Sequence, residues 1–138
     1  IPTHLVVAAY PAPDLPNPVQ ARLSLRDGDP TDLDGLIRLG LIPDGLLEPE
    51  ALRMLLPALR ADLELVLHHR HHADDPLPVP ITALGGEDDP DIAREQLAGW
   101  LRHTARDFAL RMLPGPHLFY RTHPQATLRA LLQALAPR

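Results

Sequence analysis

Cysteine is absent from the 138 residues of this sequence. Its absence excludes disulfides, thiolate metal sites and a cysteine nucleophile, and it is compatible with a reducing cytoplasm, the location we expect. Aromatic residues make up only 4% of the chain, so a core must be built mainly from leucine, valine and alanine. No uncharged apolar run is long enough to span a bilayer, and the first residues lack the basic region of a signal peptide. We therefore expect no membrane segment.

The sequence also has fewer basic than acidic residues. Thirteen basic residues face 18 acidic ones, which gives a formal net charge of -5. Non-specific nucleic-acid binding needs a basic surface, so nucleic acid is not an expected partner. The hydrophobic content of 45% and charged content of 22% are ordinary for a globular protein, and the length allows one domain at most.

Three short apolar segments are typical of buried strands: Thr3–Ala9, Ile81–Leu84 and Phe108–Leu113. A helix is expected from Ile92 to about Thr104, with Asp91 as its N-cap and Trp100 in the core. Strands that alternate with helices predict an α/β fold with a parallel sheet. A last helix is expected from Pro124, and its inner face should carry four leucines: Leu128, Leu131, Leu132 and Leu135.

Residues 11–75 differ in character from the rest of the chain. Proline clusters flank this stretch, and it lies between the first two predicted strands. Thr31 resembles the start of a capping box, and predicts a helix to about Leu39. A longer amphipathic helix should begin at Pro49 and run to Leu67, with a kink or a break at Pro57. We interpret residues 11–75 as a helical lid inserted into the domain.

The second and third predicted strands are each followed by a titratable side chain that could take part in acid–base catalysis. Gly85 and Gly86 should end the second strand, and Asp89 follows them, directly before a proline. His117 follows the Pro-Gly-Pro turn after the third strand. Carboxyl ends of parallel strands meet at the edge where open α/β sheets do their chemistry. An acid and then a histidine form the back half of a nucleophile–acid–histidine triad in the α/β-hydrolase order; the alternative is that both are simple turn residues.

The amino-acid sequences of four segments indicate a particular protein family more specifically than the spacing of the acid and the histidine does. PALRADLELV (Pro57–Val66), PITALGGEDDP (Pro80–Pro90), LAGWLRHT (Leu97–Thr104) and FALRMLPGPHLFY (Phe108–Tyr120) together resemble the type II thioesterases of polyketide and nonribosomal peptide assembly lines.

The resemblance implies an α/β-hydrolase fold with a helical lid. It implies hydrolysis of acyl or peptidyl thioesters on the phosphopantetheine arm of acyl or peptidyl carrier proteins, with no metal or organic cofactor. The catalytic acid would be Asp89, which directly precedes the proline, and the base would be His117. Pro116 stands where the family has a second glycine.

The family's nucleophile lies in a Gly-x-Ser-x-Gly elbow, and no such motif is present here. The only serine is Ser24, in Leu23-Ser24-Leu25, without a strand–turn–helix context. The chain begins with Ile1 rather than Met, and we expect an amino-terminal half that carries the elbow. It would be a separate polypeptide or adjoining sequence, or a second copy of the chain would cover the open edge of the first strand. The alternative is a catalytically inactive, truncated relative that binds a carrier protein or a partner subunit.

Other polar clusters are expected to be solvated rather than functional. The HHRHH segment lacks the spacing and supporting shell of a metal site; its histidines are His68, His69, His71 and His72. The acidic run Glu87–Asp91 lacks the alternation of a calcium-binding loop. Three arginines either are ordinary surface charge or form a basic patch for an acidic carrier protein: Arg102, Arg106 and Arg111.

Overall fold

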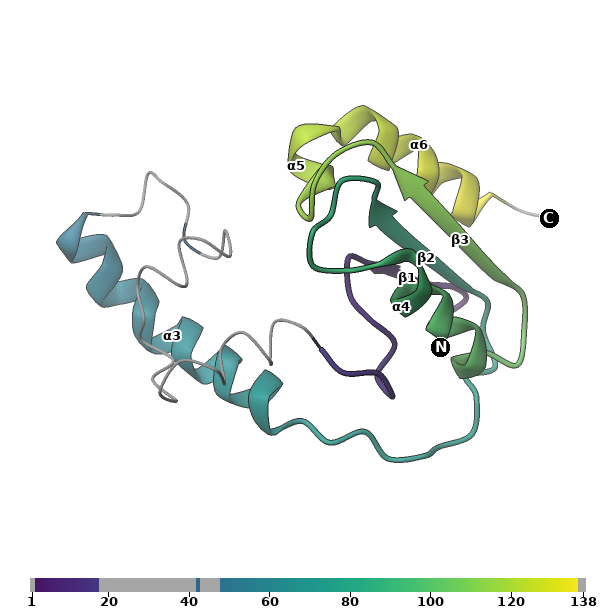
Figure 1. The fold of residues 1–138 in the computed structure, drawn as a ribbon, viewed down its shortest axis with the longest axis horizontal. Coiled ribbons are helices and arrows are strands. Elements are labelled where there is room, and N and C mark those ends of the chain that lie inside the picture. Colours follow the sequence, from purple (N-terminus) through teal and green to yellow (C-terminus); the bar gives the residue numbers. More distant parts are fainter. Residues whose placement is uncertain (1, 18–41, 43–47, 137–138) are drawn as a thin grey trace. The chain divides into compact units, whose positions relative to one another are not determined.

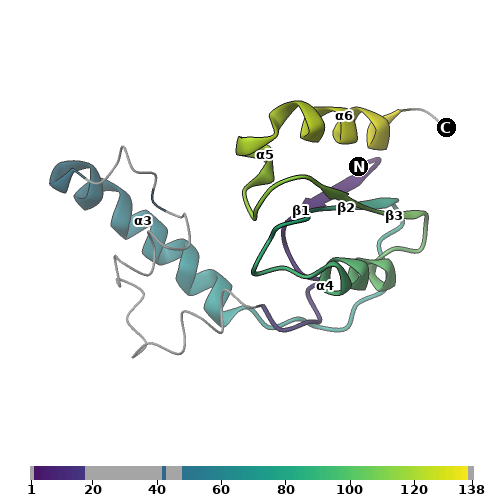
Figure 2. The same ribbon diagram turned by 45° about the horizontal axis from the view of Figure 1, so that its top comes forward.

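The computed structural model describes residues 2–17, 42 and 48–136. Its centre is a three-stranded parallel sheet in the order β1-β2-β3 (Figure 1). The strands are β1 (Leu5–Ala8), β2 (Ile81–Gly86) and β3 (Phe108–Leu113), and Ile81 of β2 lies opposite Leu5 and Phe108. Figure 2 shows a helix layer on each face of this sheet, with α4 on one side and α6 on the other. The predicted α/β class and parallel pairing are confirmed.

Strand β2 is the best-buried element, because it is hydrogen-bonded on both sides and covered on both faces. All six of its residues are buried. Successive side chains of a strand point to opposite faces. Accordingly, Ala83 packs in a cluster with Ile92 and Leu97 on the α4 side, whereas Leu84 packs with Phe119 on the α6 side.

The two glycines of β2 do not end the strand, so that prediction is wrong. Gly85 and Gly86 continue the ladder, opposite Met112 and Leu113 of β3. Neither has the positive φ that favours glycine. A Cβ atom on Gly86 would collide with the backbone carbonyl oxygen of Gly115. Glycine is therefore needed here for close approach of two chain segments rather than for a turn.

The helix after β2 begins later than predicted, and Asp91 is not its N-cap. Helix α4 (Arg94–Ala98) has Ala93 at the N-cap, whose backbone N–H donates to Oε1 of Gln96 at 2.9 Å. The chain then tightens into the 3-10 helix η2 (Gly99–His103). The prediction failed because Asp89 accepts the backbone N–H groups of Asp91 and Ile92, which keeps these residues in a turn.

After β3 come a short helix, α5 (Phe119–Thr122), and α6 (Pro124–Leu135), which begins at Pro124 as predicted. The predicted inner face of α6 is largely wrong. Ala130 is buried and Leu131 packs beside it. The remaining three leucines are exposed by 57–62%: Leu128, Leu132 and Leu135. Both sides of this helix are apolar, so its periodicity could not identify the packed side.

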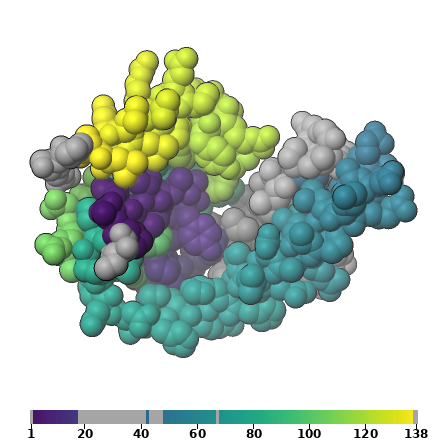
Figure 3. Space-filling view, turned by 180° about the vertical axis from the view of Figure 1, so that it is seen from behind, coloured from purple at the N-terminus to yellow at the C-terminus, as the bar shows by residue number. Residues whose placement is uncertain are grey.

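One exposed leucine of α6, Leu135, lies near the residues that precede the edge strand β1. Within the described residues, β1 pairs only with β2. Seen from behind (Figure 3), the purple first segment and the yellow α6 lie side by side at the surface. Thr3 and His4 line a pocket of about 290 Å³ together with Ala134 and Leu135. Among the described residues, the outer edge of β1 therefore has no strand partner, and exposed apolar surface of α6 lies close to the residues that precede this strand.

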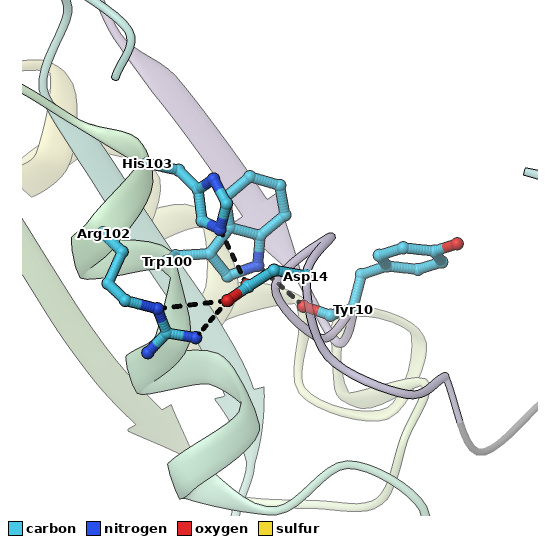
Figure 4. A network of polar contacts seen from close by, with 5 residues as sticks. All are labelled: Tyr10, Asp14, Trp100, Arg102 and His103. Atoms are coloured by element: carbon cyan, nitrogen blue, oxygen red, sulfur yellow. Dashed lines mark hydrogen bonds and ion pairs between the residues drawn. The ribbon is translucent and has the colours of Figure 1, made fainter. Parts of the chain in front are cut away.

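The segment that follows β1 is fixed to η2 by a polar network (Figure 4). Asp14 accepts hydrogen bonds from Nη2 of Arg102 at 2.6 Å and from Nε2 of His103 at 2.8 Å. The indole N–H of Trp100 donates to the backbone carbonyl of Tyr10 at 2.9 Å. The His103 hydrogen bond, and then Arg102, lower the pKa of Asp14 from 3.8 to about 2, against the opposing effect of burial. We call Asp14, Arg102 and His103 the Asp14 clamp.

The chain divides into two compact units: Ile1–Pro18 with His71–Arg138, and Val19–Arg70. The described part of the second unit contains α3 (Pro49–His68), which packs Leu63 against Ile42. Helix α3 continues through Pro57, so Pro57 does not break it; that Pro57 kinks the helix stays a prediction. Proline removes one backbone hydrogen bond, and the apolar face continues across it through Leu52, Leu55, Leu56 and Leu59. The helix predicted from Thr31 to Leu39 lies outside the described residues.

Candidate active site

The loops that follow β2 and β3 bring the two predicted site residues together. Nδ1 of His117 lies 2.8 Å from Oδ2 of Asp89. The carboxylate is fully buried, whereas 28% of the imidazole side chain is exposed. Both strands are parallel and neighbouring, so their carboxyl ends place the two loops at the same edge of the sheet (Figure 1).

Backbone contacts fix these loops to each other. The N–H of Glu87 donates to the carbonyl of Leu113 at 2.8 Å, and the N–H of Asp88 donates to the carbonyl of Gly115 at 3.0 Å. Gly115 has φ of 109°, a conformation that residues with a side chain rarely adopt. Gly86 allows the same loop to approach β2 closely. The distance between acid and histidine is thus set by backbone, not only by side-chain rotamers.

Asp89 has partners for both of its carboxylate oxygens. Oδ2 binds His117, and Oδ1 accepts the backbone N–H of Asp91 at 2.8 Å and of Ile92 at 3.1 Å. Pro90, which has no N–H, lies between Asp89 and these donors and favours the turn. Burying a carboxylate is costly unless it is well hydrogen-bonded. The three contacts meet that requirement and hold Asp89 in one orientation.

The orientation of the His117 ring is the one that acid–base chemistry requires. When Nδ1 donates its proton to Asp89, Nε2 is left unprotonated and can take a proton from another group. The negative carboxylate also stabilises the imidazolium that forms. This geometry is compatible with the predicted roles of an orienting acid for Asp89 and a general base for His117.

Asp91 belongs to the same cluster, which the sequence reasoning missed. Ligand atoms of Asp89, Asp91 and His117 all lie within 4.8 Å of one another; each residue as a whole is half-buried, although the side chain of Asp89 is fully buried. The signal available in the sequence was the Asp-Pro-Asp spacing. The hydrogen bond between Asp89 and His117 accounts for the proximity of two members without a metal ion. That the site needs no metal stays a prediction.

The other polar candidates lie elsewhere. Ser24 is outside the described residues. The four histidines of HHRHH are exposed, and in the described part of the chain they join no cluster with metal-ligand spacing. Nδ1 of His68 lies 2.8 Å from the carbonyl oxygen of Glu64 in its own helix. Arg102 is engaged by Asp14, and Arg111 by Gln133.

Comparison with known proteins identifies the family. The family model "Thioesterase domain" matches residues 1–135. Linear gramicidin dehydrogenase LgrE of Brevibacillus parabrevis is 36% identical over 137 residues, which cover 96% of this chain and 51% of LgrE. The chain thus spans about half the length of the curated relatives it matches first.

Solved structures agree in fold and in coverage. RedJ, a thioesterase of the prodiginine pathway of Streptomyces coelicolor, is 34% identical with a TM-score of 0.72; the match covers 97% of this chain and 51% of RedJ. BorB, a type II thioesterase of the borrelidin cluster, is 28% identical with a TM-score of 0.69, covering 96% and 50% of the two chains. The parallel sheet described above is thus part of an α/β-hydrolase fold.

Within the part that the structure describes, no helix has both the length and the apolar character needed to cross a membrane. Taken together, the sheet, the two loops and these similarities lead to one conclusion: the chain belongs to the thioesterase domain family and is related to the type II thioesterases of nonribosomal peptide and polyketide biosynthesis.

Proposed function

We propose that this chain supplies the acid and the base of a hydrolase that cleaves acyl or peptidyl thioesters from the phosphopantetheine arm of carrier proteins. The observation that carries the proposal is the 2.8 Å contact between Nδ1 of His117 and the buried carboxylate of Asp89. Its supporting context is a chain of the thioesterase family with both residues at the catalytic edge of the sheet.

The two residues have distinct roles in the proposed reaction. Nε2 of His117 takes the proton of a serine hydroxyl, whose oxygen attacks the thioester carbonyl carbon. The carbon–sulfur bond then breaks, and His117 returns the proton to the departing pantetheine sulfur. In the second half, His117 deprotonates a water that attacks the acyl-serine, and the serine oxygen recovers the proton. Asp89 orients the ring and stabilises its charged form throughout. No metal or organic cofactor takes part.

The serine has to come from outside residues 1–138, because the sequence has no Gly-x-Ser-x-Gly segment. A separate polypeptide or adjoining sequence would supply it. A second copy of this chain would cover the edge of β1 but would bring no such motif. Among the described residues, one edge of β1 has no strand partner and α6 has exposed leucines, and both features suit a partner that extends the sheet and adds a helix layer.

Residues 11–75 are proposed to act as the lid. Its described helix, α3, exposes apolar side chains, with Met54 exposed by 79% and Leu65 by 73%. Apolar surface of this kind would suit the acyl chain of a substrate. The carrier protein as partner and the cytoplasm as location stay predictions.

A second candidate function follows from the missing elbow. A chain that has the acid and the base but no nucleophile would be a catalytically inactive relative that binds a carrier protein or a partner subunit. Loss of both nucleophile and oxyanion donors removes most of the rate of acyl transfer. This alternative predicts binding without turnover in every combination of polypeptides.

Native mass spectrometry of the purified protein, with a denaturing run beside it, separates the two candidates. If a second polypeptide with a Gly-x-Ser-x-Gly segment is present, we expect the pair to hydrolyse an acyl-loaded carrier protein and neither chain to do so alone. If only copies of the 15.2 kDa chain are found, and they bind carrier protein without hydrolysis, the enzymatic proposal is wrong for this protein.

A further inference from the structure

We propose that Asp91 is a positioning residue of the same site, a second carboxylate that favours the charged form of the His117 ring. The inference rests on the proposed function for its catalytic meaning. Its carrying observation is the cluster of Asp89, Asp91 and His117, in which one ligand atom of each lies within 4.8 Å of the others.

The position of Asp91 is fixed relative to Asp89. Its backbone N–H donates to Oδ1 of Asp89 at 2.8 Å, and Pro90 between them has a restricted φ. The carboxylate is therefore held near the ring by the same turn that positions the main acid.

Partial burial strengthens the electrostatic interaction between the Asp91 carboxylate and the His117 ring. Asp91 is half-buried, and its Oδ1 is shielded from solvent. Charges a few ångströms apart interact more strongly where water does not screen them. When His117 accepts the nucleophile's proton, two neighbouring carboxylates stabilise the imidazolium instead of one. Without Asp89, a rotation of the Asp91 side chain would offer Nδ1 a replacement acceptor.

Other titratable groups lie near the site, and one of them can be substituted as a control for the substitution of Asp91. Glu87 and Asp88 are exposed on the same loop. Glu87 and Arg94 line, with Asp89, a pocket of about 260 Å³. The ring of His123 lies beside Gly115, under the histidine loop. Asp88 provides the matched control, because it is a carboxylate on the same turn with an exposed side chain.

The first test is an NMR titration of the His117 ring in the chain itself, assigned by comparison with His117→Gln. We expect Asp91→Asn to lower the pH of half-protonation by about half to one unit, a threefold to tenfold change in the protonation constant. Asp91→Glu should keep the pH of half-protonation close to that of the wild type. Asp88→Asn should change that pH by less than about 0.2 units. Equal shifts in Asp91→Asn and Asp88→Asn would overturn the inference. If circular dichroism shows Asp91→Asn to be misfolded, Asp91→Ser takes its place with the same expected shift.

The second test uses the protein with its nucleophile present. The single variant Asp89→Asn should retain a residual rate of hydrolysis. The double variant Asp89→Asn/Asp91→Asn should lower that residual rate by about a further tenfold, which is the free energy of one pKa unit. An unchanged residual rate would contradict the spare-acceptor role. If no wild-type hydrolysis is found in any combination, the proposed function fails, while the titration still decides whether Asp91 acts on His117.

Discussion

The described residues contain two histidine–aspartate pairs with the same separation of 2.8 Å, His117–Asp89 and His103–Asp14. In the first pair the carboxylate is fully buried, binds Nδ1 of the ring and has only backbone N–H groups as further partners. In the second pair the carboxylate is 30% exposed, binds Nε2 and is shared with Arg102.

These differences distinguish a pair with the geometry of an acid–base site from a structural pair. A general base needs a carboxylate at Nδ1 and an accessible Nε2. His103 has the opposite orientation, and the guanidinium of Arg102 neutralises the charge that would stabilise its imidazolium. The ring of His103 is also packed against Trp100 and His71, at centroid distances of 5.7 and 5.3 Å. Distance alone therefore does not identify an acid–base pair; ring orientation, burial and competing cations do.

The largest expected effect is on hydrolysis, when each carboxylate is neutralised in the protein that has its nucleophile. Asp89→Asn should lower kcat by about 10³–10⁴-fold, because the His117 ring loses the partner that fixes its tautomer. Asp14→Asn should change kcat by less than about threefold. Steady-state hydrolysis of an acyl-loaded carrier protein measures both. Equal losses in the two variants would erase the distinction between the pairs.

Glycine substitutions test how each pair is supported. A Cβ on Gly86 meets the backbone carbonyls of Gly115 and Pro116, whereas a Cβ on Gly99 meets Ala12 Cβ at 2.8 Å and Leu15 Cδ1 at 2.9 Å. The backbone at Gly115 and Pro116 can make room for a Cβ on Gly86 only if the loop that carries His117 moves. Gly86→Ala should therefore lower the free energy of unfolding by about 3 kcal/mol. Gly99→Ala should cost less, about 1 kcal/mol, because both distances are longer than those to the two carbonyl oxygens at Gly86 and Leu15 Cδ1 is the end of a flexible side chain, although Ala12 Cβ can move only with its backbone. Urea denaturation with circular dichroism compares them, and a milder effect at Gly86 would contradict this account.

A smaller effect is expected from breaking the Asp14 clamp. The lowered pKa of Asp14 corresponds to roughly 2 kcal/mol, but Arg102 is 56% exposed, so solvent screening reduces the contribution. We expect Asp14→Asn to lower the free energy of unfolding by about 1 kcal/mol, measured by the same urea titrations. No loss of stability would mean that the clamp is only a surface contact.

The pH dependence of the clamp gives the finest test. The pKa of Asp14 is depressed from 3.8 to about 2, so its stabilisation is fully present above the unfolded-state value and is lost as pH falls through about 2. The stability difference between wild type and Asp14→Asn should therefore shrink as the pH falls from about 5 towards about 2. A difference that grows with acid would have the wrong sign for this mechanism.

Much of the fold could be predicted from the sequence, because local patterns determined it. Strand β3 has the predicted bounds, and α6 begins at the predicted Pro124. The roles of Gly85 and Gly86 could not be predicted, since close approach to the Gly115 loop is a property of the tertiary structure. The packed side of α6 was missed because a small residue, Ala130, faces the core while leucines face outward.

The proximity of Asp89 and His117 could be predicted from the sequence, whereas the detailed surroundings of the pair could not. Asp89 and His117 follow consecutive parallel strands, and topology alone brings such positions to one edge. The placement of Asp91 depends on the turn that Asp89 forms with the next two backbone N–H groups. The Asp14 clamp joins residues 88 and 89 positions apart, which no local pattern indicates.

The most direct test of the central claim is to substitute the two paired histidines in the nucleophile-containing protein and to measure hydrolysis of an acyl-loaded carrier protein. The account predicts that His117→Gln lowers kcat by about 10³-fold or more, while His103→Gln retains most of the activity. Full hydrolysis by His117→Gln would contradict the assignment of Asp89 and His117 as the acid and base of a thioesterase.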